Sequence, residues 1–404
     1  MMDTKSPLEK ILSPAERRRS IAVDHQRRSV RLIRDGETDR SDGPMTNDPA
    51  VYVDADWARV ERKAIFTEMP LLAGFGVDIP EAGDKLLFEA TGVPILVVRA
   101  GDGRVNAFLN MCTHRAAKLV TECTRSKKMT CRFHAWTFDL EGMLTGMPAK
   151  ESFAGIAKAD RGLIRVPVVE WAGMIFVKPR PGDDEIDIEA FLADFAPEVA
   201  QLEFERMRLV KATRLEIDAN WKYALDTYGE AYHFNSLHPS SIGSTHYTDR
   251  MCYDDFNPHH RIAYPYKHVG AYIGRSESEW PDEPFNAVHL LFPNVILNVW
   301  QIDAGPAYSI YRLFPGETPD KAFALTATYR PDTADPDVDD QPWIDLHDYI
   351  EEVVTTEDYS VSADGQRNLA HAPADFRVVY GSNEIAIQNF HRRLAAYIDA
   401  ERAR

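Results

Sequence analysis

The sequence reads Cys112-Thr113-His114 and, after sixteen intervening residues, Cys131-Arg132-Phe133-His134. Each of these short loops offers one thiolate and one imidazole. Two thiolates on one iron and two imidazoles on the other form the ligand set of a [2Fe-2S] cluster whose reduction potential lies above that of an all-cysteine cluster. The spacing therefore predicts an electron-carrying centre with Cys112, His114, Cys131 and His134 as its ligands.

Zinc is the alternative occupant, because two cysteines and two histidines also bind Zn²⁺. Zinc fingers pair Cys with Cys and His with His along the chain, whereas each loop here supplies one of each. We therefore interpret the set as a Rieske-type cluster, with a zinc-stabilised binding module as the alternative. Rieske proteins of respiratory complexes carry two further cysteines, which join the two loops by a disulfide. This sequence has Ala117 and Phe133 at those positions. The absence of these cysteines predicts a potential near the low end of the range, about −150 mV, which suits an oxygenase.

A second candidate metal site lies in the second half of the chain. Glu230-x2-His233-x4-His238 supplies one carboxylate and two imidazoles within nine residues. Pro239 biases His238 out of helical geometry, so we expect a helix that carries His233 and then a turn that carries His238. Two histidines and one carboxylate, with coordination positions left open, form the facial triad of non-haem Fe(II) oxygenases.

The remaining carboxylate of the triad is predicted to be Asp358. Three apolar residues lie at helical spacing from it: Ile350, Val354 and Val361. Asp358 would therefore share their buried face, where an acid is costly unless it is paired or bound to a metal. Glu357 is rotated by about 100° and is expected to meet solvent. Each residue alone also suits an ordinary salt bridge or core position, and only the cluster motif in the same chain favours iron.

Composition excludes several classes of protein. The formal net charge of −17 argues against a nucleic-acid partner. Four cysteines give no disulfide framework, and no apolar run has the length of a membrane span or signal peptide, so we expect a cytoplasmic protein that does not enter a membrane. No glycine-rich dinucleotide fingerprint occurs, which places nicotinamide and flavin on a separate reductase.

Hydrophobic patterning predicts an α+β protein of 404 residues in three parts. These are an N-terminal helical arm over 1–50, a β-rich cluster domain over 51–182 and a catalytic mononuclear iron domain over 183–404. Strands are expected at 85–91, 94–99, 105–110, 163–169, 174–179, 207–218, 289–303, 307–314 and 322–329. Helices are expected at 8–34, 55–66, 188–200, 220–235, 342–363 and 382–402, with an acidic loop at 331–341.

Taken together, the motifs resemble the large (alpha) subunit of Rieske non-haem iron oxygenases, a group of aromatic-ring-hydroxylating dioxygenases with monooxygenase and demethylase relatives. Besides the two loops, the resemblance is carried by Asn220-Trp221-Lys222, by Glu230-Ala231-Tyr232-His233 to His238-Pro239, by Glu357-Asp358 with Gln366, and by Asn383-Glu384 with Phe390-His391. Ala116 and Ala135 depart from it, because glycine is usual at both positions.

The resemblance implies a β-rich Rieske domain and a helix-grip catalytic domain that has an antiparallel sheet and a long C-terminal helix. It also implies a homotrimer in which electrons cross between subunits, through an acid beside the iron ligand His233. Glu230 fits that bridge, and Asp226 is the alternative.

The expected function is therefore that of an oxygenase component, which uses O2 and electrons from NAD(P)H to hydroxylate an aromatic or other hydrophobic substrate. A separate reductase, with or without a ferredoxin, would deliver the electrons to the cluster and the Fe(II). Oxidative demethylation of a quaternary amine or a methyl ether is the alternative reaction, and a pure electron-transfer protein is the non-enzymatic one. Apolar residues that could line the substrate pocket are Leu225, Phe234, Leu237, Val288, Leu290, Ile296 and Val299.

Overall fold

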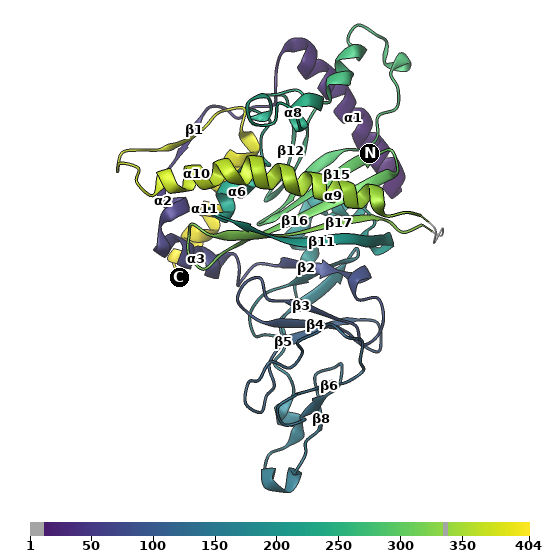
Figure 1. Ribbon diagram of the computed structural model, residues 1–404, viewed down its shortest axis with the longest axis vertical. Helices are drawn as coiled ribbons and strands as arrows, with labels where there is room; N and C mark the ends of the chain where they lie inside the picture. Colours follow the sequence, from purple (N-terminus) through teal and green to yellow (C-terminus); the bar gives the residue numbers. More distant parts are fainter. Residues whose placement is uncertain (1–11, 334–337) are drawn as a thin grey trace, which may run out of the picture.

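The computed structural model describes residues 12–333 and 338–404. Residues 8–11 of the first expected helix and 334–337 of the expected acidic loop lie outside the described residues. The molecule is elongated, with small antiparallel sheets at one end and a large sheet crossed by long helices at the other (Figure 1). This arrangement confirms the predicted α+β class. Within the described residues, no helix has both the length and the apolar character needed to span a membrane.

Three small sheets build the narrow end of the molecule. They are β2 (Leu71–Phe75) with β10 (Met174–Val177) and β9 (Val168–Trp171), β3 (Lys85–Phe88) with β4 (Ile95–Arg99) and β5 (Val105–Leu109), and β6 (Met129–Thr130) with β7 (Thr137–Phe138) and β8 (Leu144–Gly146). The expected strands at 85–91, 94–99 and 105–110 are thus confirmed, whereas 163–169 begins later than expected.

Strand β4 separates two hydrophobic cores because successive side chains of a strand point to opposite faces. Ile95 and Val97 belong to a large core that also contains residues of the C-terminal half. Leu96 and Val98 belong to a smaller core that includes the two cysteines of the predicted cluster. The cluster end therefore has its own core, joined to the rest of the protein through this strand.

The large sheet has seven antiparallel strands in the order β11-β17-β16-β15-β14-β13-β12. They are β11 (Met207–Ile217), β12 (Cys252–Phe256), β13 (His259–Ala263), β14 (Ala287–Leu291), β15 (Val295–Ile302), β16 (Gly305–Pro315) and β17 (Ala322–Pro331). The strand expected over 289–303 is in fact a hairpin, β14 and β15. Its turn includes Pro293, which cannot donate a ladder hydrogen bond. Strands β12 and β13 lie where no strand was predicted.

One long helical segment crosses the large sheet (Figure 1). It consists of α9 (Gln341–Val353), a π-helical turn η8 (Val354–Asp358) and α10 (Tyr359–Leu369). A π-helical turn holds one residue more than an α-helical turn and often occurs at functional sites. The turn therefore changes which residues of this segment face the interior.

The other helices are α1 (Pro14–Asp35), α2 (Ala50–Val53), α3 (Ala55–Ala64), α4 (Ile188–Leu192), α5 (Ala196–Ala200), α6 (Trp221–Asp226), α7 (Phe234–Leu237), α8 (Ile242–Thr245) and α11 (Ile385–Arg402). Helix α3 packs against α11, and β1 (Met45–Asn47) pairs with β18 (Val378–Tyr380). The segment from β1 to α3 thus contacts the C-terminal part of the chain and then leads into the small sheets.

Helix α1 lies against its own chain. Arg28 pairs with Asp254 at 2.6 Å and with Asp39 at 2.7 Å, and its side chain is only partly exposed. The apolar residues Ile21, Val30 and Leu32 of this helix are buried. The basic character of the N-terminal segment is therefore largely neutralised by acids of the same molecule.

Candidate metal centres

The two cluster loops have the same backbone geometry although their histidines stand at different spacings. In the first loop, the amide of Cys112 donates to the carbonyl of Ala117 at 2.8 Å, and the amide of Ala116 donates back to the carbonyl of Cys112 at 2.9 Å. In the second loop, the amide of Cys131 donates to the carbonyl of Trp136 at 2.8 Å, and the amide of Ala135 donates back to the carbonyl of Cys131 at 2.9 Å. Both cysteines are thereby held in the buried core.

Ala116 and Ala135 occupy equivalent positions of the two loops, four residues after each cysteine. Both have left-handed backbone angles, with φ of 59° and 57°. An L-residue with a Cβ pays roughly 1–2 kcal/mol in this region, whereas glycine enters it freely. The two alanines noted in the sequence are therefore placed where the backbone itself favours glycine.

The side chains of the loops fit a metal cluster. Cys112 and Cys131 are 1% and 2% exposed, and the rings of His114 and His134 lie 4.6 Å apart. Burial raises the pKa of the Cys112 thiol. The Nδ1 atom of His114 is buried without a hydrogen-bond partner among the described residues. An orphaned imidazole nitrogen beside two buried thiols is the arrangement that a bound metal cluster would satisfy.

The second site forms around the short helix α7. His233 immediately precedes this helix and His238 immediately follows it. The helix expected over 220–235 is wrong beyond Asp226, because α6 ends there and residues 227–233 form turns. Gly229 lies in this turn, where an added Cβ would come within 2.7 Å of Ile387 on α11. Close approach of α11 therefore requires glycine at a position where a regular helix was expected.

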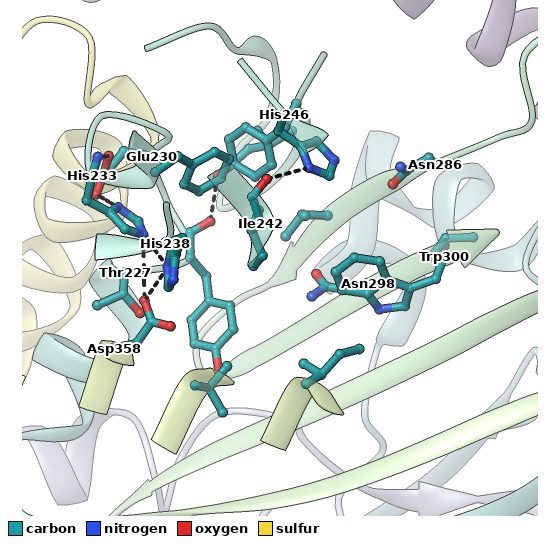
Figure 2. A pocket seen from close by; sticks show the side chains of 18 residues that line it. Thr227, Glu230, His233, His238, Ile242, His246, Asn286, Asn298, Trp300 and Asp358 are labelled. Carbon is teal, nitrogen blue, oxygen red and sulfur yellow. Dashed lines mark hydrogen bonds and ion pairs between the residues drawn. The ribbon is translucent and has the colours of Figure 1, made fainter. Parts of the chain in front are cut away.

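The two histidines converge with Asp358, as Figure 2 shows. The Nε2 atoms of His233 and His238 are 3.1 Å apart. Oδ1 of Asp358 lies 3.6 Å from the first Nε2 and 3.4 Å from the second. The structure thus brings together the three residues that the sequence analysis selected as ligands of the mononuclear iron. Two imidazole nitrogens and one carboxylate oxygen suit Fe(II), and they leave the pocket side of the site open.

Two further carboxylates hold the opposite nitrogens of the imidazoles. Nδ1 of His233 contacts Glu230, and Nδ1 of His238 contacts Glu357. Glu357 also accepts a hydrogen bond of 2.9 Å from the hydroxyl of Ser241. A carboxylate on Nδ1 fixes the tautomer in which Nε2 is free to bind a metal.

Glu357, which was expected to meet solvent, has a side chain that is 29% exposed, but its carboxylate contacts His238. The expected burial of Val361 was wrong, because this residue is 44% exposed. The extra residue of the π-helical turn explains the exposure of Val361. Beyond it, the buried face continues through Asp358, Ser362 and Gln366, four residues apart each time. A regular helix would have given Val361 the place that Ser362 takes.

Asp226 and Glu230 have different surroundings. Asp226 accepts a hydrogen bond of 2.6 Å from the hydroxyl of Tyr52 and contacts Nε2 of His391 at 3.0 Å. It is 7% exposed. Glu230 instead contacts the candidate ligand His233 directly. Asp226 thus stabilises the junction of α6 and α11, and Glu230 is the acid that lies next to the metal site.

A largely apolar pocket adjoins the triad. Its lining comprises Thr227, Tyr228, Glu230, His233, Phe234, His238, Ile242, His246, Ile262, Tyr264, Asn286, Val288, Asn298, Val299, Trp300, Ile350, Val354 and Asp358. Of the apolar residues expected to line it, Phe234, Val288 and Val299 do so, whereas Leu225, Leu290 and Ile296 lie in the large core. Leu237 does not line the pocket either. The polar residues Asn298 and Trp300 were not anticipated.

Comparison with known proteins matches the family model for a Rieske [2Fe-2S] domain to residues 73–167. The model for the ring-hydroxylating alpha subunit (catalytic domain) matches residues 204–400. The chain therefore belongs to the Rieske oxygenases as an alpha subunit, which confirms the resemblance and the pair of cofactors, a [2Fe-2S] cluster and a mononuclear iron. The zinc alternative is not supported by these matches.

Among its relatives, the glycine betaine monooxygenase oxygenase subunit of Chromohalobacter salexigens is 32% identical over 207 residues, which cover 50% of this chain and 43% of the relative. The biphenyl 2,3-dioxygenase subunit alpha of Rhodococcus jostii is 29% identical over 46% of this chain and 42% of the relative. The chain thus matches about half the length of these relatives or less. The crystal structure of a quaternary ammonium Rieske monooxygenase in complex with L-carnitine matches 89% of this chain and 96% of its own, with a TM-score of 0.74. At 20% identity, this match shows that the two proteins share a fold.

Proposed function

We propose that this protein is the oxygenase component of a multicomponent system that oxidises a hydrophobic small molecule with O2. Electrons would come from NAD(P)H through a separate reductase, with or without a ferredoxin. The observation that carries this proposal is the opening of the His233, His238 and Asp358 triad onto a largely apolar pocket. A structural metal site would need no such cavity beside its open coordination positions.

An Fe(II) ion held by the triad would supply the dioxygen chemistry, and the cluster would supply electrons one at a time. The protein's own groups prepare the site for it. Glu230 and Glu357 orient the two imidazoles. The apolar walls formed by Phe234, Val288 and Ile350 limit the access of water to the reacting atoms.

The two metal sites lie toward opposite ends of the long axis of the molecule (Figure 1), with β6 of the cluster end far from α8 beside the triad. Electron transfer within one chain is therefore disfavoured. We propose a homotrimer in which His134 of one subunit approaches Glu230 of the next. His134 is partly exposed, and the Glu230 side chain is 11% exposed while contacting His233.

Oxidative demethylation of a quaternary amine is the second candidate function. Four aromatic residues line the pocket: Tyr228, Phe234, Tyr264 and Trp300. Aromatic faces attract quaternary ammonium groups through cation–π interactions. Relatives named for glycine betaine and carnitine oxidation make this reaction a specific alternative to hydroxylation.

The proposal predicts three iron atoms per chain, two of them in a cluster with a Rieske-type paramagnetic signal after reduction. Asp358→Ala should remove the single iron and spare the cluster signal. Two irons in the unchanged protein would instead favour a pure electron-transfer role, and full turnover by Asp358→Ala would refute its role as a ligand.

The electron path is tested separately. Glu230→Gln should retain both metals and slow the re-oxidation of the reduced cluster in the presence of substrate and O2. Unchanged re-oxidation would shift the bridge to Asp226. Oxygen uptake measured together with product, over a panel of aromatic compounds and methylated amines and with a generic reductase, would identify the reaction.

A further inference from the structure

Two polar groups in the pocket wall have no partner. Oδ1 of Asn298 and Nε1 of Trp300 are buried without a hydrogen bond to any residue in the described ranges, 12–333 and 338–404. Asn298 is 7% exposed as a whole. Buried polar groups are costly when they remain unpaired, and exceptions in a native fold call for an explanation such as a missing ligand.

The two groups act on one part of the pocket. Both residues belong to β15 and stand two positions apart, so their side chains leave the same face of the sheet. Figure 2 shows Asn298 and Trp300 on the side of the pocket away from the triad of His233, His238 and Asp358. Ile242 lies between this pair and the triad. A molecule lying between them would have one end at the metal and the other at an acceptor and a donor.

The charge of the lining restricts what that molecule can be. Its only acids are Glu230 and Asp358, both at the triad, and no lysine or arginine occurs among the described lining residues. His246, near the same end, is held neutral because burial lowers its pKa to about 4. A carboxylate at the end of the pocket away from the triad would therefore find no cationic side chain among the described lining residues, and burying an unpaired carboxylate is strongly unfavourable.

From these observations we propose that the substrate is a neutral aromatic or other hydrophobic molecule with one polar group that both donates and accepts a hydrogen bond, such as a carboxamide or a hydroxyl. Asn298 would accept from this group and Trp300 would donate to it, which directs the apolar body toward the metal. The inference rests on the proposed function and narrows its substrate. It disfavours the carboxylated quaternary amines named in the relatives.

Calorimetric binding to the purified holoprotein tests the proposal, with benzamide, toluene and L-carnitine as probes. Benzamide should bind more tightly than either of the others. Asn298→Leu should weaken benzamide binding about 10- to 100-fold, which is the usual cost of losing a hydrogen-bond partner at a buried polar group, and should leave toluene binding unchanged. Trp300→Phe, which removes only the N–H from an aromatic side chain, should also weaken benzamide selectively.

Gln301→Leu is the matched control, because it makes the same amide-to-leucine change on β15 at an exposed position outside this pocket. Tighter binding of L-carnitine than of benzamide would overturn the inference, and so would equal benzamide affinity in the wild type and both pocket variants. If benzamide binding depends on Asn298 and Trp300 but no compound gives oxygenated product, the ligand preference of the pocket stands and the proposed function fails. Trp300→Phe keeps the test decisive should Asn298→Leu not fold.

Discussion

Replacing Glu357 should weaken iron binding although the residue is not one of the three ligands. Its carboxylate holds Nδ1 of His238, whose side chain is 1% exposed. A hydrogen bond to a charged group is worth roughly 1.5–3 kcal/mol, and 1.4 kcal/mol corresponds to a factor of about ten in affinity. Glu357→Ala should therefore lower the affinity for Fe(II) about 10- to 100-fold, the usual range for a partner of a ligating histidine.

Glu357→Gln keeps an acceptor of the same shape but loses the charge, which roughly halves the strength of the bond. Its loss in affinity should be only about 3- to 10-fold. Competition with a ferrous chelator under anaerobic conditions measures both values, while the cluster absorbance serves as an internal standard. Glu352→Ala, which changes an exposed acid on the same long helical segment, is the control. Iron affinity within about twofold of wild type in Glu357→Ala would refute this reasoning.

Three further perturbations act on the fold. Glu61→Ala should lower the free energy of unfolding in urea by about 3–5 kcal/mol, because the fully buried Lys222 loses its partner at 2.6 Å, and Glu61→Leu with Lys222→Met should recover most of it. Thermal stability should fall as the pH drops from about 7 toward 5, because burial lowers the pKa of His259 to about 4 and of His289 to about 3. Both stay neutral in the folded state and gain a proton on unfolding below about pH 6.5, so each contributes up to about 1.4 kcal/mol per pH unit, and a flat profile would contradict this. Ala116→Gly should stabilise the first loop by up to about 1 kcal/mol and slow the loss of cluster absorbance on heating; faster loss would argue against strain at this position.

The sequence was sufficient for both metal motifs because ligand type and short spacing are local properties. Cys112 and Cys131 are recognised from the histidines that follow them, and Asp358 from the apolar period of its helix together with the cluster motif in the same chain. The same apolar period gave a wrong prediction at Val361, three residues after Asp358. Nothing in the pattern signals a π-helical turn, so the sequence places Val361 in the interior.

Other parts of the site depend on long-range packing. Gly229 interrupts the expected helix because α11 approaches it closely, and a glycine within a helical pattern was the available local signal. Asn298 and Trp300 were missed because they lie in a strand that reads as an ordinary buried run. The partners of Asp226, namely Tyr52 and His391, come from distant segments and could not be paired with it by spacing.

The division of side chains along β4 has a practical consequence for handling this protein. Ile95 and Val97 belong to the large core, whereas Leu96 and Val98 belong to the core of the cluster end. Oxidative loss of the cluster, which removes the colour of a preparation, should therefore disturb the core of the cluster end and leave the large core and the iron triad intact. Colour would then report on the redox history of a sample, and a colourless batch could still show a sharp melting transition and one tightly held iron.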